Sequence, residues 1–224
     1  MTRGRMPEID QADGSIPVHE FLNAFLHGYF PMGTGGPDAP VRWFNPEMRC
    51  ILPLDAFRFP RRLRRFARRH AVRATFDQDF SAVIAGCANR DETWINNRIT
   101  DLYLRLHEFD LAHSVEVRIG GRLVGGLYGF SLGGAFSGES MFSLHPGASQ
   151  IALLHLVTRL RESGFLLLDV QFQTPHLARF GTTEVSRRHY LELLGSAVRT
   201  GAGFNAQPSS ETTASLLQRT SHTS

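Results

Sequence analysis

The hydrophobic positions of this chain change their period along its length, from helical spacing at both ends to strict alternation in the middle. Helical spacing predicts helices over residues 15–28, 79–87, 97–108 and 150–163, and another that starts at Pro60. The alternating stretches "SVEVRI" and "RLVGGLYGF", joined by Gly120-Gly121, predict a β-hairpin, and "AFSGESMFS" continues it as a meander. This order of elements favours an α+β fold.

One apolar strand, "GFLLLDVQF", contains an acid and an amide where a buried strand would carry aliphatic residues. Because side chains alternate along a strand, Asp169 and Gln171 are expected to point the same way, beside Leu167. A strand end that meets solvent would explain them simply. A buried carboxylate, however, costs several kcal/mol unless it is paired. Asp169 therefore needs either a partner or a function.

The same pattern divides the chain into three parts. We expect an N-terminal subdomain over residues 1–70, a second domain over residues 71–198 and a disordered tail over residues 199–224. The tail is polar and poor in apolar residues, which is typical of disorder. No internal repeat is present.

Composition narrows the class of protein. The 224 residues are 42% hydrophobic, but no run of 18 apolar residues predicts a membrane span, and the first residues do not resemble a signal peptide. Cys50 and Cys87 lie far apart, and the ten histidines show no ligand spacing, so we expect neither a disulfide nor a metal site. We expect a cytoplasmic protein.

Charge adds a candidate nucleic-acid surface. All 24 basic residues are Arg, and six of them, with no acid, lie in "RRLRRFARR". On a helix Leu63, Phe66 and Ala67 form the inner stripe, whereas Arg61, Arg64, Arg65 and Arg68 lie opposite. A solvated face is the plainer alternative, but such faces usually mix signs, so we favour a phosphate-binding surface.

Several motifs, taken together and in order, identify a family. "GYFPMG", "RWFNPEMRCILP", "LVGGLYG", "FSGESMFS", "LLDVQ" and "RRHYL" resemble the leucyl/phenylalanyl-tRNA–protein transferases over about residues 18–194. The resemblance implies a GNAT-like C-terminal domain, a mainly antiparallel sheet with flanking helices, that uses no coenzyme A or other cofactor. It implies transfer of Leu, Phe or Met from aminoacyl-tRNA to an N-terminal Arg or Lys, which marks the protein for degradation.

The resemblance also assigns roles to residues of this chain. It implies that Asp169 and Gln171 form the reaction centre. We expect Gln171 to orient the attacking amine and Asp169 to fix the Gln171 amide or take a proton. The resemblance further implies a donor pocket, substrate contacts and a site for the tRNA acceptor stem. These comprise Leu127, Phe136, Met141, Leu156 and Leu168 for the pocket, Glu139, Ser140, Trp43 and Trp94 for the contacts, and Arg61, Arg64, Arg65, Arg68 and Arg69 for the stem. The partners it implies are the 3′ end and acceptor stem of aminoacyl-tRNA and protein N-termini, and we expect a monomer.

Arg118, Gln150 and Arg179 depart from the family pattern, and "WFNP" stands where the family usually has Trp/Tyr-Ser-Pro. An Arg near the site could shift the acceptor toward acidic or neutral N-termini. Other readings also stay open. They are a coenzyme A-dependent acyltransferase, a non-catalytic RNA-binding module and a tRNA-dependent ligase of cell-wall precursors. The loop "HPGASQ" argues against the first, because it has one Gly and no cationic Lys or Arg for a pyrophosphate.

Overall fold

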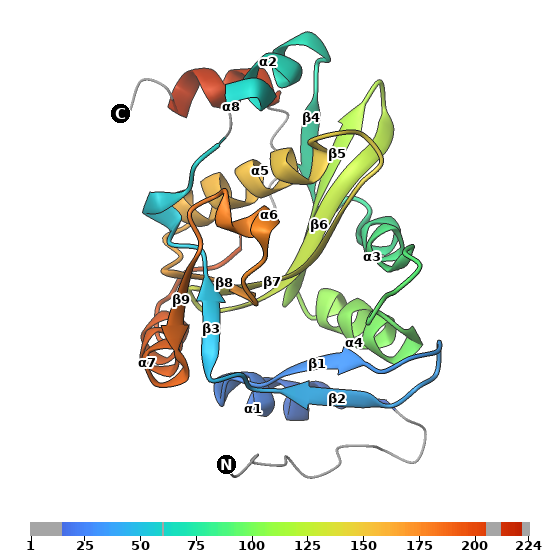
Figure 1. Ribbon diagram of the computed structural model, residues 1–224, viewed down its shortest axis with the longest axis vertical. Helices are drawn as coiled ribbons and strands as arrows, with labels where there is room; N and C mark the ends of the chain where they lie inside the picture. The colour runs from blue at the N-terminus through green and yellow to red at the C-terminus, as the bar shows by residue number, and fades with distance from the viewer. Residues whose placement is uncertain (1–14, 60, 205–211, 221–224) are drawn as a thin grey trace.

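The computed structural model describes residues 15–59, 61–204 and 212–220. Its centre is a seven-stranded sheet in the order β4-β5-β6-β7-β8-β3-β9 (Figure 1). The strands are β3 (Met48–Ile51), β4 (Arg73–Phe76), β5 (Ala112–Ile119), β6 (Arg122–Leu132), β7 (Ala135–Ser143), β8 (Leu167–Gln171) and β9 (Thr183–Ser186). All neighbours are antiparallel except β7 and β8, which are parallel.

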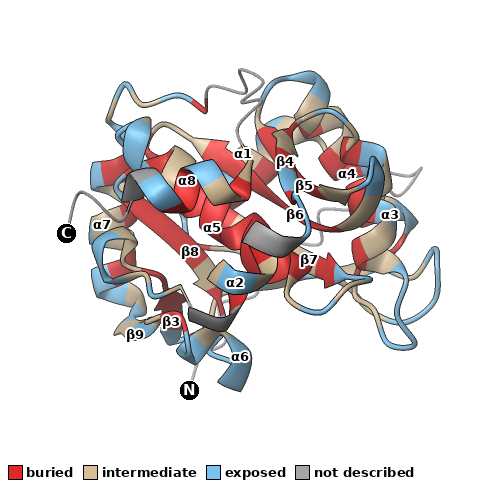
Figure 2. Ribbon diagram, turned by 90° about the horizontal axis from the view of Figure 1, so that it is seen from above, coloured by how far each residue is buried: buried red, intermediate tan, exposed pale blue. Residues whose placement is uncertain are grey.

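Helices cover both faces of the sheet. The parallel pair needs a crossover, which α5 (Ala148–Glu162) supplies, and α5 is buried along most of its length (Figure 2). Its apolar side chains form one core with Leu127 and Leu168. The second core lies on the other face. It is built by α1 (Val18–Leu26), α3 (Phe80–Ala88), α4 (Asn97–Glu108) and α7 (Arg187–Val198).

Much of the predicted secondary structure is confirmed. The α+β class, the mainly antiparallel sheet and the hairpin at Gly120-Gly121 are present. The helix predicted over residues 97–108 has those bounds, because the Asn96 side chain caps it by accepting a hydrogen bond from Ile99 N at 3.1 Å. Further short elements are α2 (Arg61–Arg69), α6 (Pro175–Ala178) and a 3₁₀ turn, Leu54–Ala56.

The predicted domain boundary at residue 70 does not divide the sheet. Strand β3 precedes that boundary in sequence, yet it pairs with both β8 and β9. A second hairpin, β1 (Phe30–Gly33) with β2 (Val41–Phe44), occupies the segment that the sequence predicts as a Gly/Pro loop. The N-terminal 70 residues therefore contribute a strand to the catalytic sheet itself.

Part of the segment predicted as a disordered tail is helical. Residues Thr213–Thr220 form α8, which lies beside α2 (Figures 1 and 2). Leu216 and Leu217 are buried in the core around α5, and the imidazole of His155 hydrogen-bonds the Thr213 hydroxyl at 2.9 Å. Two adjacent leucines are enough to anchor this short helix even though the segment is polar overall. Residues 205–211 and 221–224 of the predicted tail lie outside the described residues.

Candidate functional site

A cavity of about 330 Å³ opens beside the parallel strands β7 and β8. Its apolar end is lined by side chains of the central sheet and of α5, and its mouth by the β1 strand, by the segment before α4 and by α6. The apolar end comprises Leu127, Met141, Leu153, Leu156 and Leu168, the mouth includes Phe30, Met32, Trp94, Phe172 and His176, and the polar lining includes Arg90, Glu139, Ser140 and Gln171.

Four of the five predicted donor-pocket residues line this cavity, namely Leu127, Met141, Leu156 and Leu168. Phe136 does not. It is 1% exposed, and its ring lies against Gly129, where an added Cβ would come within 2.3 Å of the ring. The missing side chain of Gly129 therefore lets Phe136 pack back into the core. Leu153, one helical turn before Leu156 on α5, takes a place in the lining that the sequence did not predict.

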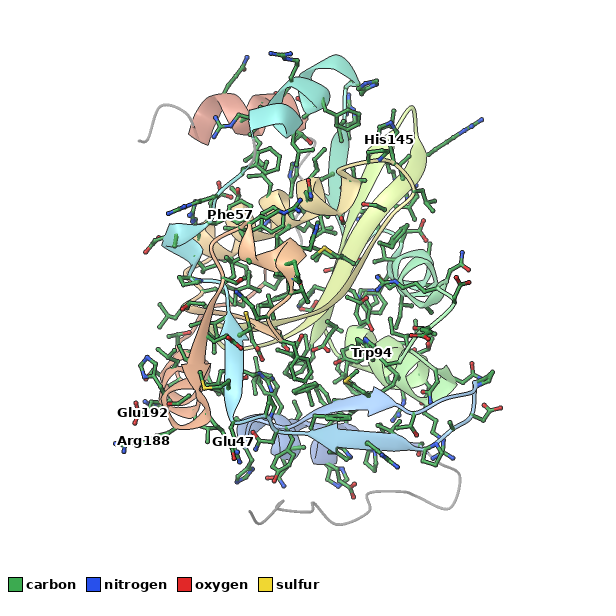
Figure 3. All side chains as sticks on the ribbon, in the orientation of Figure 1. Glu47, Phe57, Trp94, His145, Arg188 and Glu192 are labelled. Carbon is green, nitrogen blue, oxygen red and sulfur yellow. The ribbon has the colours of Figure 1, made fainter. Side chains whose placement is uncertain are left out.

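The two tryptophans have different positions. Trp94, labelled in Figure 3, lines the mouth, and its carbonyl accepts a hydrogen bond from Gly33 N at 2.9 Å. Trp43 lies on β2 and packs against Phe21, with ring centroids 6.3 Å apart, outside the cavity lining. Phe30 and Met32, on the partner strand of the same hairpin, face the cavity instead.

Asp169 has a partner that the sequence did not reveal. Its carboxylate forms a two-pronged ion pair with Arg49 of β3, at 2.9 Å from Arg49 Nε to Oδ1 and 2.6 Å from Nη2 to Oδ2. Both side chains are 1% exposed. The Tyr190 hydroxyl donates a further hydrogen bond to Oδ2 at 2.9 Å. Arg49 is the lone cation of an apolar stretch, "MRCI", and that is the signal that could have indicated it.

Two aromatic rings and a backbone carbonyl fix the position of the Arg49 guanidinium. Its guanidinium lies 4.4 Å from the ring centre of Phe30 and 4.6 Å from that of Tyr190, and Nη1 donates to the Gly28 carbonyl at 3.1 Å. Burial is the largest influence on Arg49 and would lower its pKa, but Asp169, Tyr190 and Glu139 together outweigh it and raise that pKa. Arg49 therefore keeps its positive charge.

Gln171 breaks the alternation of β8. Its backbone has a φ of 57°, the left-handed region, and its N–H donates to Asp169 Oδ1 at 2.9 Å. Its side-chain nitrogen donates to the Ser137 hydroxyl at 2.7 Å. The left-handed turn places Gln171 in the cavity lining, whereas Asp169 is absent from it. The prediction that the two side chains share a face is therefore wrong, and Asp169 holds the Gln171 backbone amide rather than its side chain.

Glu139 is the carboxylate of the cavity lining, two residues after Ser137 on β7. Burial raises its pKa to about 7, although Ser137 and Tyr103 act in the opposite direction. Beside it, Ser140 accepts a hydrogen bond from Arg90 Nη2 at 3.3 Å, and Arg90 also reaches the Met141 carbonyl. A carboxyl group that titrates near neutral pH thus faces the cavity.

The Arg-rich helix is a separate surface. On α2, Leu63 and Ala67 are buried, Arg64 is half-buried and Arg65 is exposed, as the helical stripe predicts. Phe66 stacks on His145, labelled in Figure 3, with ring centroids 4.7 Å apart. The side chains of Arg61, Arg68 and Arg69 lie outside the described part of the structure.

None of the three unusual residues lines the cavity. Arg179 is exposed at the end of α6, Gln150 is buried in the first turn of α5, and Arg118 pairs with Asp79 at 2.8 Å. Among the described residues no cluster of three His, Cys, Asp or Glu side chains could hold a metal ion. No helix within that part of the chain is long and apolar enough to cross a membrane.

Comparison with known proteins supports the motif resemblance. The family described as leucyl/phenylalanyl-tRNA protein transferase matches residues 51–195. A curated leucyl/phenylalanyl-tRNA–protein transferase of Maricaulis maris is 49% identical over 211 residues, which cover 92% of this chain and 98% of the relative. Its counterpart in Chlorobium luteolum is 47% identical over 193 residues, which cover 84% and 99%.

Solved structures resemble the chain more distantly. FemX overlaps 74% of this chain and 65% of its own, with a TM-score of 0.49 and 12% identity. A ribosomal-protein-alanine N-acetyltransferase of Brucella melitensis overlaps 49% and 87%, with a TM-score of 0.37 and 20% identity. The curated relatives and the matched residues 51–195 decide the question: the chain is an aminoacyltransferase that belongs to the leucyl/phenylalanyl-tRNA–protein transferase family.

Proposed function

We propose that this protein transfers Leu, Phe or Met from aminoacyl-tRNA to the N-terminal amine of proteins that begin with Arg or Lys, and so marks them for degradation. The observation that carries the proposal is a largely apolar cavity whose lining includes a polar group, Gln171, held in an unusual backbone conformation. Such a cavity can hold an aminoacyl side chain while its ester reaches the polar end.

The apolar end selects the donor. Five aliphatic or thioether side chains line it, so a charged donor side chain would be desolvated there without a partner. Discrimination between Leu, Phe and Met is weaker, about 1–3 kcal/mol for each methylene of difference. We place the terminal adenosine at the mouth, against Trp94, Met32 and Phe30, and not against Trp43.

The reaction needs little chemical assistance. An aminoacyl ester is already activated, and an α-amine with a pKa of about 8 is partly neutral at physiological pH. Because Ser137 binds the Gln171 side-chain nitrogen, the side-chain oxygen is left to accept a hydrogen bond from the attacking amine. Glu139, whose pKa is about 7, is suited to take the proton that the amine releases.

The acceptor assignment follows from the charges of the lining. Glu139 is its carboxylate and can attract a cationic N-terminal residue, whereas Arg179 lies outside it. The structure also disfavours coenzyme A, because Leu63 packs over the first turn of α5, within 2.4 Å of a Cβ added at Gly147. Leu63 therefore occupies part of the space at that helix start where a pyrophosphate would bind. We propose further that α2 contacts the acceptor stem and that the protein acts as a cytoplasmic monomer.

Transfer assays with charged tRNA test these assignments. Peptides beginning with Arg, Lys, Asp, Glu and Ala are incubated with a mixture of charged tRNAs, and the added mass is read. We expect Leu, Phe or Met on the Arg and Lys peptides, and Gln171→Ala to lower kcat by about 10²-fold with tRNA binding preserved. Transfer to Asp or Glu that is lost in Arg179→Ser would overturn the acceptor assignment. Transfer of Asp or Lys as donor would contradict the apolar pocket.

A further inference from the structure

We propose that Arg49 is a positioning residue of the transfer reaction, which acts by holding Gln171 in its left-handed conformation through the ion pair with Asp169. The inference rests on the proposed role of Gln171. It assigns Asp169 to support rather than to proton transfer. It also brings into the site a residue that lies outside the segment matched to the family, residues 51–195.

Asp169 is fully committed to its protein partners. Oδ1 accepts hydrogen bonds from Arg49 Nε and from Gln171 N, both at 2.9 Å. Oδ2 accepts from Arg49 Nη2 at 2.6 Å and from the Tyr190 hydroxyl at 2.9 Å. Each oxygen accepts at least two hydrogen bonds from protein groups, the carboxylate is 1% exposed, and it is absent from the cavity lining. It therefore cannot approach a substrate amine. Its function is to fix what surrounds it.

Without Asp169, the backbone of Gln171 would leave its left-handed conformation. A left-handed backbone costs a non-glycine residue about 1–2 kcal/mol, so Gln171 needs a bond that favours it. The hydrogen bond from Gln171 N to Asp169 Oδ1 supplies that bond, and hydrogen bonds to a charged acceptor contribute about 1.5–3 kcal/mol. Without it, β8 would regain its extended form, and strand alternation would turn Gln171 away from the cavity.

Arg49 makes a charged Asp169 possible at this depth. A buried carboxylate without a cation is costly, and the guanidinium supplies the opposite charge with a matching fork of donors. The same guanidinium lies against Phe30, which lines the mouth of the cavity. Arg49 thus contacts both Asp169, which holds Gln171, and Phe30, which belongs to the part of the cavity lining proposed to bind the adenosine. A Lys could provide the charge but neither the fork nor the flat surface between two rings.

The test separates variants that lose activity because the protein unfolds from variants that lose it because Gln171 is misplaced. In Arg49→Met/Asp169→Leu both charges are removed, so no unpaired charge remains and the protein should fold, since such apolar replacements of buried pairs are often tolerated. We expect kcat to fall by about 10²-fold, because Gln171 N has lost its acceptor, while KM for the donor changes little. Arg49→Lys keeps the charge and should also lose at least about 10-fold in kcat. Arg118→Met, which breaks the Arg118–Asp79 pair outside the cavity, is the matched control and should keep wild-type kcat.

Thermal unfolding and Gln171→Ala are measured in parallel. The inference about Arg49 would be overturned if kcat of the double variant, or of Arg49→Lys, stayed within twofold of wild type. A low kcat of Gln171→Ala would then still support the proposed function. A Gln171→Ala variant with wild-type kcat would instead show that the proposed role of Gln171 is wrong. If the double variant does not fold, Arg49→Lys decides, since a residue needed for stability alone would be rescued by the conserved charge.

Discussion

At the scale of single residues, the environment of each carboxylate decides its role. Asp169 and Glu139 lie on neighbouring parallel strands but in different environments. Asp169 is paired with the Arg49 guanidinium, whereas Glu139 lines the largely apolar cavity. Sequence parity could place Glu139 and Ser137 on one face of β7, but it could not show that Arg49, 120 residues before Asp169, would reach it. Ion pairs between distant segments leave no local pattern.

The raised pKa of Glu139 predicts a pH-dependent stability. Its ordinary value is 4.5 and its folded value is about 7, so between these pH values the folded protein holds a proton that the unfolded chain has lost. The free energy of unfolding should therefore fall as the pH rises through this window, because an ionised Glu139 is poorly solvated. Glu139→Gln, which is neutral at every pH, should raise Tm relative to wild type at pH 8 and change it little at pH 4, below both pKa values.

Thermal unfolding at the two pH values checks this prediction. The exposed Glu108→Gln is the control, and its Tm difference from wild type should not depend on pH in this way. An equal effect of Glu139→Gln at both pH values would mean that Glu139 titrates in its ordinary range.

At the scale of elements, the Arg-rich helix α2 leads to a prediction about the salt dependence of tRNA binding. If Arg65 contacts a phosphate, Arg65→Gln should weaken binding to every tRNA alike and lower the slope of log affinity against log salt by about one unit or less. Transfer from an aminoacyl-adenosine should hardly change, because the cavity is a separate site. Binding measured at several salt concentrations tests this, with Arg122→Gln at the exposed start of β6 as the control.

The helix α8 offers a second prediction, because it packs against α2. Leu217 is fully buried, so Leu217→Ala should lower the free energy of unfolding by about 2–5 kcal/mol. It should also weaken tRNA binding more than transfer from aminoacyl-adenosine, since α8 supports the Arg-bearing helix and not the cavity. Denaturant unfolding and the two transfer assays check it. Unchanged stability would mean that α8 does not hold the molecule together.

How well an element could be predicted depended on its length and on its partners. The twelve residues of α4 and the hairpin at Gly120-Gly121 have strong local periods, and the sequence predicted both. Strands β1, β2 and β3 have four residues each, too few to show a period, and they exist because a distant or adjacent strand pairs with them. The same limit applies to Gln171, whose left-handed backbone depends on contacts that only the folded chain makes.

At the scale of the whole molecule, the site is assembled from segments far apart in sequence. Strand β3, from the first quarter of the chain, lies between β8 and β9 and carries Arg49 to Asp169 (Figure 1). The β1–β2 hairpin supplies Phe30 and Met32 to the cavity mouth, and α5 supplies Leu153 and Leu156 to its apolar end. The N-terminal part thus contributes both to the central sheet and to the cavity lining, across the boundary predicted at residue 70.

This arrangement predicts that the catalytic region cannot fold alone. A fragment over residues 71–198 lacks β3, so β9 loses the strand to which it pairs, and one edge of β8 is left open. It also leaves Asp169 buried without Arg49, a loss expected to cost about 3–5 kcal/mol, which is a large share of a typical domain's stability. We therefore expect no cooperative thermal transition from residues 71–198. A matched fragment over residues 15–220, which keeps every described strand, should unfold in one transition. Thermal unfolding of the two fragments, followed by circular dichroism, tests this expectation. Cooperative unfolding of residues 71–198 would mean that this region is an independent domain and that its sheet is stable without β3.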